Sequence, residues 1–120
     1  RGSVEAVVQH QATPMGPIRM AECTGSLEVA VDASADPVIS GAGDCIDASG
    51  SVWSLALDGE IPSSPDAEGT LDLTGGFADV RDDWIGAFET DNLAGTADGV
   101  VGGGDVYPWT EWRIAFSVDR

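Results

Sequence analysis

The chain contains no lysine, a single histidine and a single tyrosine. It also has no uninterrupted apolar run of the roughly 20 residues that would span a membrane. Five arginines face 21 acidic side chains, for a formal net charge of −16. A field of this sign repels nucleic-acid phosphates and anionic lipid surfaces, so we expect no nucleic-acid partner and no membrane insertion. The acidic side chains are expected to form a solvated surface; attraction of cations or of a basic partner is the alternative.

At 120 residues the chain is expected to form one domain with a single core. No helical periodicity survives over a window of roughly 11 residues, whereas the period-2 alternation of β-strands recurs throughout. The alternation predicts strands over residues 4–10, 18–32, 38–47, 51–61, 69–77, 83–90, 92–101 and 109–119. Most of the connections are too short for parallel crossovers, which favours an antiparallel up-and-down meander.

Each predicted strand has one apolar face, which a single open sheet would leave in water. The sheet must therefore close into a barrel or fold into a sandwich. Eight strands in a meander favour an all-β, roughly eight-stranded barrel, with a β-sandwich as the alternative. The predicted core comprises Trp53, Leu55, Leu57, Leu73, Phe88, Ile114 and Phe116. Tight curvature is predicted at the inward glycines Gly25, Gly75, Gly86 and Gly95.

The two cysteines, Cys23 and Cys45, stand at opposite ends of a predicted hairpin whose turn is signalled by Asp36-Pro37. Cys23 shares its alternation with Leu27, and Cys45 shares its own with Ile39, so both side chains can face the core. A metal site would need more Cys or His ligands, and a redox pair usually lies in C-x-x-C. The sequence therefore predicts one structural disulfide and an oxidising location: extracellular, cell surface or periplasmic.

The N-terminal run, residues 1–13, is separated from the single β-domain of residues 14–120 by "TPMGP". It is predicted to be the first barrel strand or, alternatively, an exchangeable arm that pairs with another subunit. In the second case the apolar row of Val4, Ala6 and Val8 would contact the partner.

A catalytic group is hard to assemble from this sequence. His10 is flanked by two glutamines, and the predicted disulfide leaves no nucleophilic thiol. Asp82 and Asp83 are adjacent, so they would point to opposite faces of a strand, and they are interpreted as a turn before Trp84. We therefore expect no enzyme activity and no cofactor.

Aspartates gather in or near the predicted loops, where they are favoured turn residues. None of these segments has the spacing of a calcium-binding EF-hand loop. No metal site is predicted, although cations remain candidates for the acidic loops. The aspartates concerned are Asp32, Asp36, Asp44, Asp47, Asp79, Asp82, Asp83, Asp91 and Asp98.

A closed eight-stranded barrel can hold a small ligand, but the inward side chains here are bulky and would largely fill it. Trp109 departs from the core pattern because it is in phase with Glu111 and Arg113. With Tyr107 it is predicted to form an exposed aromatic contact for a ligand or a partner.

Four segments carry a resemblance to known proteins: "CTGSLEVAVDASADPVISGAGDC", "DGEIPSSPDAEGTLDL", "WIGAFETDNLAGTADG" and the closing "WRIAFSVDR". Over residues 20–120 they resemble secreted or lipid-anchored β-domains of Gram-negative, myxobacterium-like bacteria. That resemblance implies a surface or extracellular location without an assigned activity. The glycine and tryptophan pattern is also similar to avidin-like barrels, but their polar ligand-contacting positions are not evident here.

Two function classes follow. The first is a non-catalytic structural or interaction protein of the cell exterior, and in particular a self-assembling subunit that uses its N-terminal strand. The second is a small-ligand or glycan-binding barrel module that uses Tyr107, Trp109 and the neighbouring acidic loops.

Overall fold

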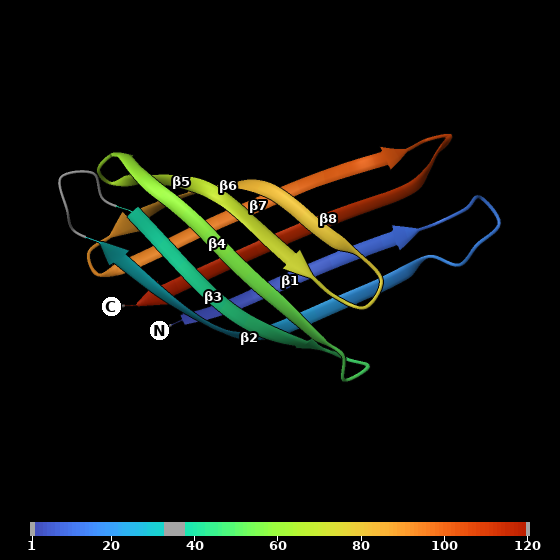
Figure 1. Cartoon of the computed structure of the whole chain (residues 1–120), viewed down its shortest axis with the longest axis horizontal. Coiled ribbons are helices and arrows are strands. Elements are labelled where there is room, and N and C mark those ends of the chain that lie inside the picture. Colours follow the sequence, from blue (N-terminus) through green and yellow to red (C-terminus); the bar gives the residue numbers. More distant parts are fainter. Residues whose placement is uncertain (1, 33–37, 120) are drawn as a thin grey trace.

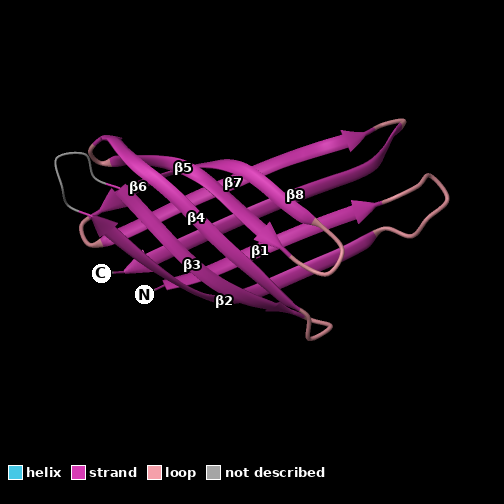
Figure 2. Ribbon diagram, viewed as in Figure 1, coloured by secondary structure: helices cyan, strands magenta, loops and turns pink. Residues whose placement is uncertain are grey.

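The computed structural model describes residues 2–32 and 38–119, and these form eight β-strands joined by loops (Figures 1 and 2). None of the described residues belongs to a helix that could cross a membrane. The strands are β1 (Gly2–Gln11), β2 (Arg19–Asp32), β3 (Val38–Asp47), β4 (Val52–Ser63), β5 (Asp66–Thr74), β6 (Asp79–Glu89), β7 (Asn92–Gly103) and β8 (Val106–Asp119).

The strands close into an antiparallel barrel in sequence order, because β1 pairs with both β2 and β8. The predicted up-and-down barrel is thus confirmed in preference to the sandwich. The molecule is elongated, with principal extents of 52 × 29 × 18 Å. The N- and C-terminal strands start and finish at one end of the barrel (Figure 1). We call the opposite end, where the β1–β2 and β7–β8 connections project, the distal end.

The barrel interior is filled by apolar side chains from all eight strands. The Trp84 and Phe116 rings meet edge to face there, with centroids 5.2 Å apart, an arrangement that aromatic pairs favour. Six of the seven predicted core residues are buried: Trp53, Leu55, Leu57, Leu73, Ile114 and Phe116. Phe88 faces inward as predicted, but it is only half-buried because it lies close to the end of β6. Its prediction as a buried core residue is therefore wrong.

The predicted disulfide is confirmed. Cys23 and Cys45 lie on β2 and β3 with Cα atoms 5.3 Å apart, inside the range for a disulfide. In register, Cys45 stands opposite Gly25, and Cys23 stands opposite Asp47, so the bond crosses the strand pair diagonally. Both sulfur-bearing residues are buried, as their alternation predicted. The turn predicted at Asp36-Pro37 lies outside the described residues.

Glycine allows close packing at Gly95 of β7. A Cβ atom placed there would lie 2.5 Å from Cζ of Phe116 and 3.1 Å from Cε3 of Trp84, closer than carbon atoms pack. Gly95 pairs with Gly86 of β6, and both face inward as predicted. Gly75 differs from its prediction, because it lies in the β5–β6 connection, where it packs over the face of Trp53 instead of bending a strand.

Two predicted connections are strands in the structure. Residues 79–83, interpreted as a turn, form the start of β6, in which Val80, Asp82 and Trp84 share the inward face. Residues 106–108 likewise belong to β8. The segment "DVRDD" was not recognised as a strand because an acidic residue, Asp82, occupies an inward position where the alternation would normally have an apolar residue.

The ladder between β6 and β7 is the shortest in the barrel. It runs only from Ile85 opposite Thr96 to Glu89 opposite Asn92. Toward the distal end β6 continues with β5 alone and β7 continues with β8 alone, so the two strands diverge. The Asp82 carboxylate bridges this divergence by accepting a hydrogen bond from the Trp112 indole N–H at 2.8 Å.

Candidate functional site

The N-terminal residues predicted to contact a partner lie inside the barrel. Val4, Ala6 and Val8 are each at most 2% exposed. They face β2 and β8 partners along nearly the whole length of β1, from Gly2 to His10. Contact of these side chains with another subunit would therefore require β1 to leave its own barrel.

His10 lies at the distal end of the interior. Its Nδ1 is 2.8 Å from the Thr110 hydroxyl, and its ring lies 6.3 Å from that of Phe77. Phe77, from the β5–β6 connection, also packs edge to face on Trp53 and lies under the Arg19 guanidinium, 4.9 Å from its centroid. The Phe77 ring thus closes this end of the barrel between a cation and two other rings.

Asp47 holds the β3–β4 turn together, a role that its interpretation as an incidental loop aspartate missed. One carboxylate oxygen accepts hydrogen bonds from the Ser49 and Ser51 backbone N–H groups and from the Ser49 hydroxyl. The other accepts the Trp53 indole N–H at 2.9 Å. The bonds from the Ser49 and Trp53 side chains, which favour the charged form, lower the pKa of Asp47 from 3.8 to about 2.

The acidic loops show no assembled cation site. In residues 2–32 and 38–119, no three His, Cys, Asp or Glu side chains converge as ligands for a metal ion. Asp72 of β5 forms an ion pair with Arg81 of β6, with 3.4 Å between the charged atoms. Both partners are well exposed, so the pair contributes little stability.

Trp109 lies on the outer face of the distal end, as its alternation with Glu111 and Arg113 predicted, and Tyr107 precedes it by two residues on β8. Both are half-buried, whereas the sequence predicted an exposed aromatic contact. Cross-strand pairing brings two exposed apolar side chains to the same face: Met20, 56% exposed, and Val100, 59% exposed. In register these two residues stand at the ends of a row whose middle is formed by Gln9 and Glu111. We call Met20, Val100, Tyr107 and Trp109 the distal patch.

Glutamines fix the polar edges of the distal patch. The Trp109 indole N–H donates a hydrogen bond to Oε1 of Gln11 at 2.9 Å, and Nε2 of Gln11 donates to the Gly16 carbonyl. Nε2 of Gln9 donates to the sulfur of Met20 at 3.4 Å. The aromatic faces and the methionine methyl group are therefore the parts of this patch that remain available for contact.

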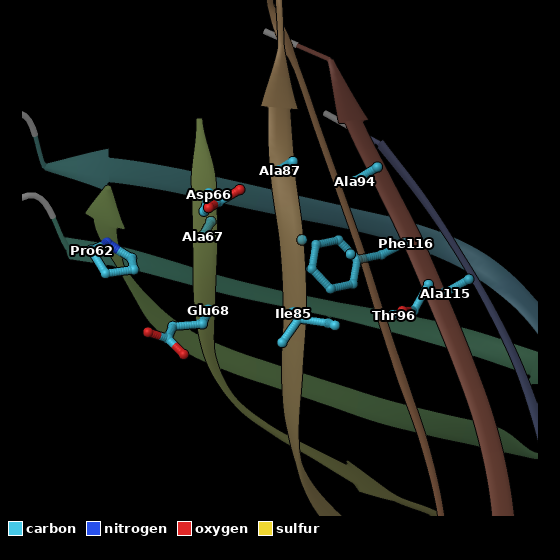
Figure 3. A pocket seen from close by; sticks show the side chains of 12 residues that line it. Pro62, Asp66, Ala67, Glu68, Ile85, Ala87, Ala94, Thr96, Ala115 and Phe116 are labelled. Atoms are coloured by element: carbon cyan, nitrogen blue, oxygen red, sulfur yellow. The ribbon is translucent and has the colours of Figure 1, made fainter. Parts of the chain in front are cut away.

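A groove, separate from the distal patch, lies on the outer wall where β5, β6, β7 and β8 run side by side (Figure 3). It is a groove of about 760 Å³ that sequence reasoning missed. The outward side chains along it are small, apart from Ile85, which is 68% exposed. They are Ala87, Ala94, Thr96 and Ala115. Asp66 and Glu68 of β5 stand along one side of it.

The paired inward glycines Gly86 and Gly95 account for the depth of this groove. Because Gly95 carries no side chain, the Phe116 ring packs directly against β7 and forms part of the groove lining together with both glycines (Figure 3). The alternation predicted the inward direction of the glycines, but the groove depends on side chains from four strands.

Comparisons with protein-family models, with curated proteins and with solved structures found no match. The resemblance to secreted or lipid-anchored bacterial β-domains, and that to avidin-like barrels, therefore remain predictions.

Proposed function

We propose that the protein is a non-catalytic interaction protein of the cell exterior that associates with copies of itself through the distal patch. The observation that carries the proposal is that Met20, Val100 and Trp109 stand on neighbouring strands of one outer face, around Gln9 and Glu111, with Tyr107 two residues from Trp109, while core side chains fill the interior. Exposed apolar side chains grouped in this way are characteristic of interaction surfaces. The association would use side-chain contacts and leave every barrel strand in place.

The disulfide supports a location outside the reducing cytoplasm. Bonds such as Cys23–Cys45 persist in extracellular and periplasmic environments and are rare in the cytosol. The extracellular space, the cell surface or the periplasm is accordingly the compartment that we propose.

The charge distribution favours contact between copies at the distal end. Two molecules that each carry a formal charge of −16 repel each other at low salt. Between Glu5 and Glu22, however, the chain has no acidic residue, and this stretch forms most of β1 and the β1–β2 connection. Two copies that meet there bring few carboxylates together on the β1 side of the patch. Glu111 stands in the middle of the row, and salt should strengthen the contact by screening its charge and that of the other carboxylates.

Sedimentation velocity of the pure protein in about 0.05 M and about 0.5 M NaCl tests this proposal. We expect a mass above that of the monomer at the higher salt, and a shift back to monomer in Met20→Asp. The matched control is Val38→Asp, at the other end of the barrel, where Val38 is 51% exposed against 56% for Met20. A full-length protein that is monomeric at both salt concentrations would contradict the proposal.

The N-terminal strand offers a different route to assembly, by strand exchange, and deletion of residues 1–13 distinguishes the two. If β1 serves another subunit, the shortened chain should be a folded monomer. If β1 serves its own barrel, the loss of Val4, Ala6 and Val8 from the core should unfold the chain. We expect unfolding, measured as loss of the β-sheet circular dichroism signal.

The alternative function is glycan or small-ligand binding at the distal patch. Tyr107 and Trp109 are two residues apart in β8 and both are half-buried, so each has part of its ring available to stack on a sugar. Saturable quenching of tryptophan fluorescence by a panel of oligosaccharides, lost in Trp109→Ala, would favour this function. The same quenching retained in Trp109→Ala would argue against it.

A further inference from the structure

We propose that the groove on the outer wall of β5–β8 binds an extended, basic peptide segment of a partner protein. This goes beyond self-association, because the groove residues belong to a different surface from the distal patch. The two surfaces share no residue.

The floor of the groove is suited to apolar contact. Ala87 of β6 and Ala94 of β7 stand opposite each other in the ladder, as do Ile85 and Thr96 in the next row. Ile85 is 68% exposed, so much of its side chain is in water and would gain from being covered. The short neighbouring side chains leave room for a bound segment to reach it (Figure 3).

The β5 side of the groove carries acidic side chains that would attract a positively charged partner. Asp66 and Glu68 line it, and Glu60 of β4 stands directly opposite Glu68 in the ladder. All three are exposed, and no arginine is among the lining residues. The nearest arginine on β8, Arg113, stands opposite Asp98 of β7, beyond the groove. Lysine or arginine side chains of a partner would therefore meet unneutralised carboxylates here.

The dimensions favour a peptide in extended form. Neighbouring strands lie about 4.8 Å apart, so the distance from β5 to β8 is about 14 Å, which an extended segment covers with about four residues. Every second side chain of such a segment faces the wall, so a wall-facing basic residue at one end can reach Glu68 and Asp66 while the next wall-facing residue, if apolar, covers Ile85. A small cation would satisfy the carboxylates but would leave the floor of the groove uncovered.

Fluorescence anisotropy with a labelled hexapeptide of three arginines followed by three valines tests the inference, in about 0.05 M NaCl. In extended form this peptide presents both arginine and valine side chains to the wall. The full-length protein should bind it saturably and should bind a glutamine-for-arginine version much more weakly. The double variant Asp66→Asn, Glu68→Gln should weaken binding about tenfold. The control Glu22→Gln, Glu28→Gln removes the same charge from exposed positions of β2, and it should change affinity less than twofold.

A second pair of variants tests the floor without changing charge. Ala94→Met should fill the groove and weaken peptide binding at least tenfold, whereas Ala42→Met on the outer face of β3 should have no effect. Equal losses in the groove variants and their controls would overturn the inference, because binding would then follow overall charge. Spermine binding with the same affinity as the peptide would overturn the assignment to a peptide. Neither result bears on self-association, which is measured without peptide.

Discussion

Substitution of Gly95 by alanine tests how the barrel interior is packed. A Cβ at this position would lie 2.5 and 2.8 Å from two carbons of the Phe116 ring and 3.1 Å from Trp84. Carbon atoms pack best at about 3.5–4.0 Å, so the ring must move or the strand must shift. Overpacking of this kind costs about 1–3 kcal/mol. The 2.5 Å contact places Gly95→Ala in the upper part of that range, at about 2–3 kcal/mol. Alanine returns about 0.4–1 kcal/mol by restricting the unfolded chain, which leaves a net loss of about 1–2.6 kcal/mol.

Urea unfolding followed by tryptophan fluorescence measures this loss. The matched control is Gly76→Ala in the β5–β6 connection, where nothing lies within 4 Å of the added methyl group. Its free energy of unfolding should rise by about 0.4–1 kcal/mol, because only the restriction of the unfolded chain acts there.

A double-mutant cycle then assigns the loss to the Phe116 ring. Phe116→Leu shortens the side chain that the new methyl group would strike. Combined with Gly95→Ala, it should therefore destabilise by less than the sum of the single variants, with a difference of at least about 0.5 kcal/mol. Additive losses, or a neutral Gly95→Ala, would refute the packing of Phe116 beneath β7.

Three further predictions concern the disulfide, the acid response and the extent of the core. Replacing Cys23 and Cys45 by alanine should lower the free energy of unfolding by about 3.4 kcal/mol in the chain-entropy model, and non-reducing mass spectrometry of the native protein should find no free thiol. Asp47 has a pKa of about 2, below its ordinary 3.8, so the stability due to its charge is present above about pH 4 and lost as the pH falls toward 2. Asp47→Asn should therefore melt below the native protein at neutral pH, and the gap should narrow across that interval; a constant gap would contradict this reasoning. Phe116→Ala should cost about 3–5 kcal/mol, whereas Phe88→Ala should cost about 1–2 kcal/mol because its ring is only half-buried.

The sequence predicted those features of the fold that depend on local alternation. Because side chains alternate strictly along a strand, the parity of Cys23 and Cys45 was enough to predict two buried, bonded cysteines. The same parity predicted Trp109 on the outer face and Ile114 in the core. Closure of the barrel followed from the need to bury one face of eight strands.

The features that were not predicted depend on tertiary structure. Asp82 was interpreted as a turn residue because acidic side chains surround it, yet it faces the interior and accepts the Trp112 N–H. That bond joins β6 to β8 beyond the point where the β6–β7 ladder stops, and no local pattern specifies where a ladder stops. Phe88 has the predicted orientation, but its exposure depends on where the barrel ends. The groove likewise is lined by residues of several strands, Gly86 and Gly95 among them, that only the closed sheet brings together.

The two methionines allow the most direct measurement of association through the distal patch. Met20 belongs to the patch, whereas Met15, 96% exposed in the β1–β2 connection, serves as an internal reference in the same molecule. Their oxidation by dilute hydrogen peroxide, followed by peptide mass spectrometry, is compared at low and high protein concentration in about 0.5 M NaCl. If copies associate through the patch, oxidation of Met20 should slow several-fold relative to Met15 as the concentration rises. An unchanged ratio of the two rates would contradict the account.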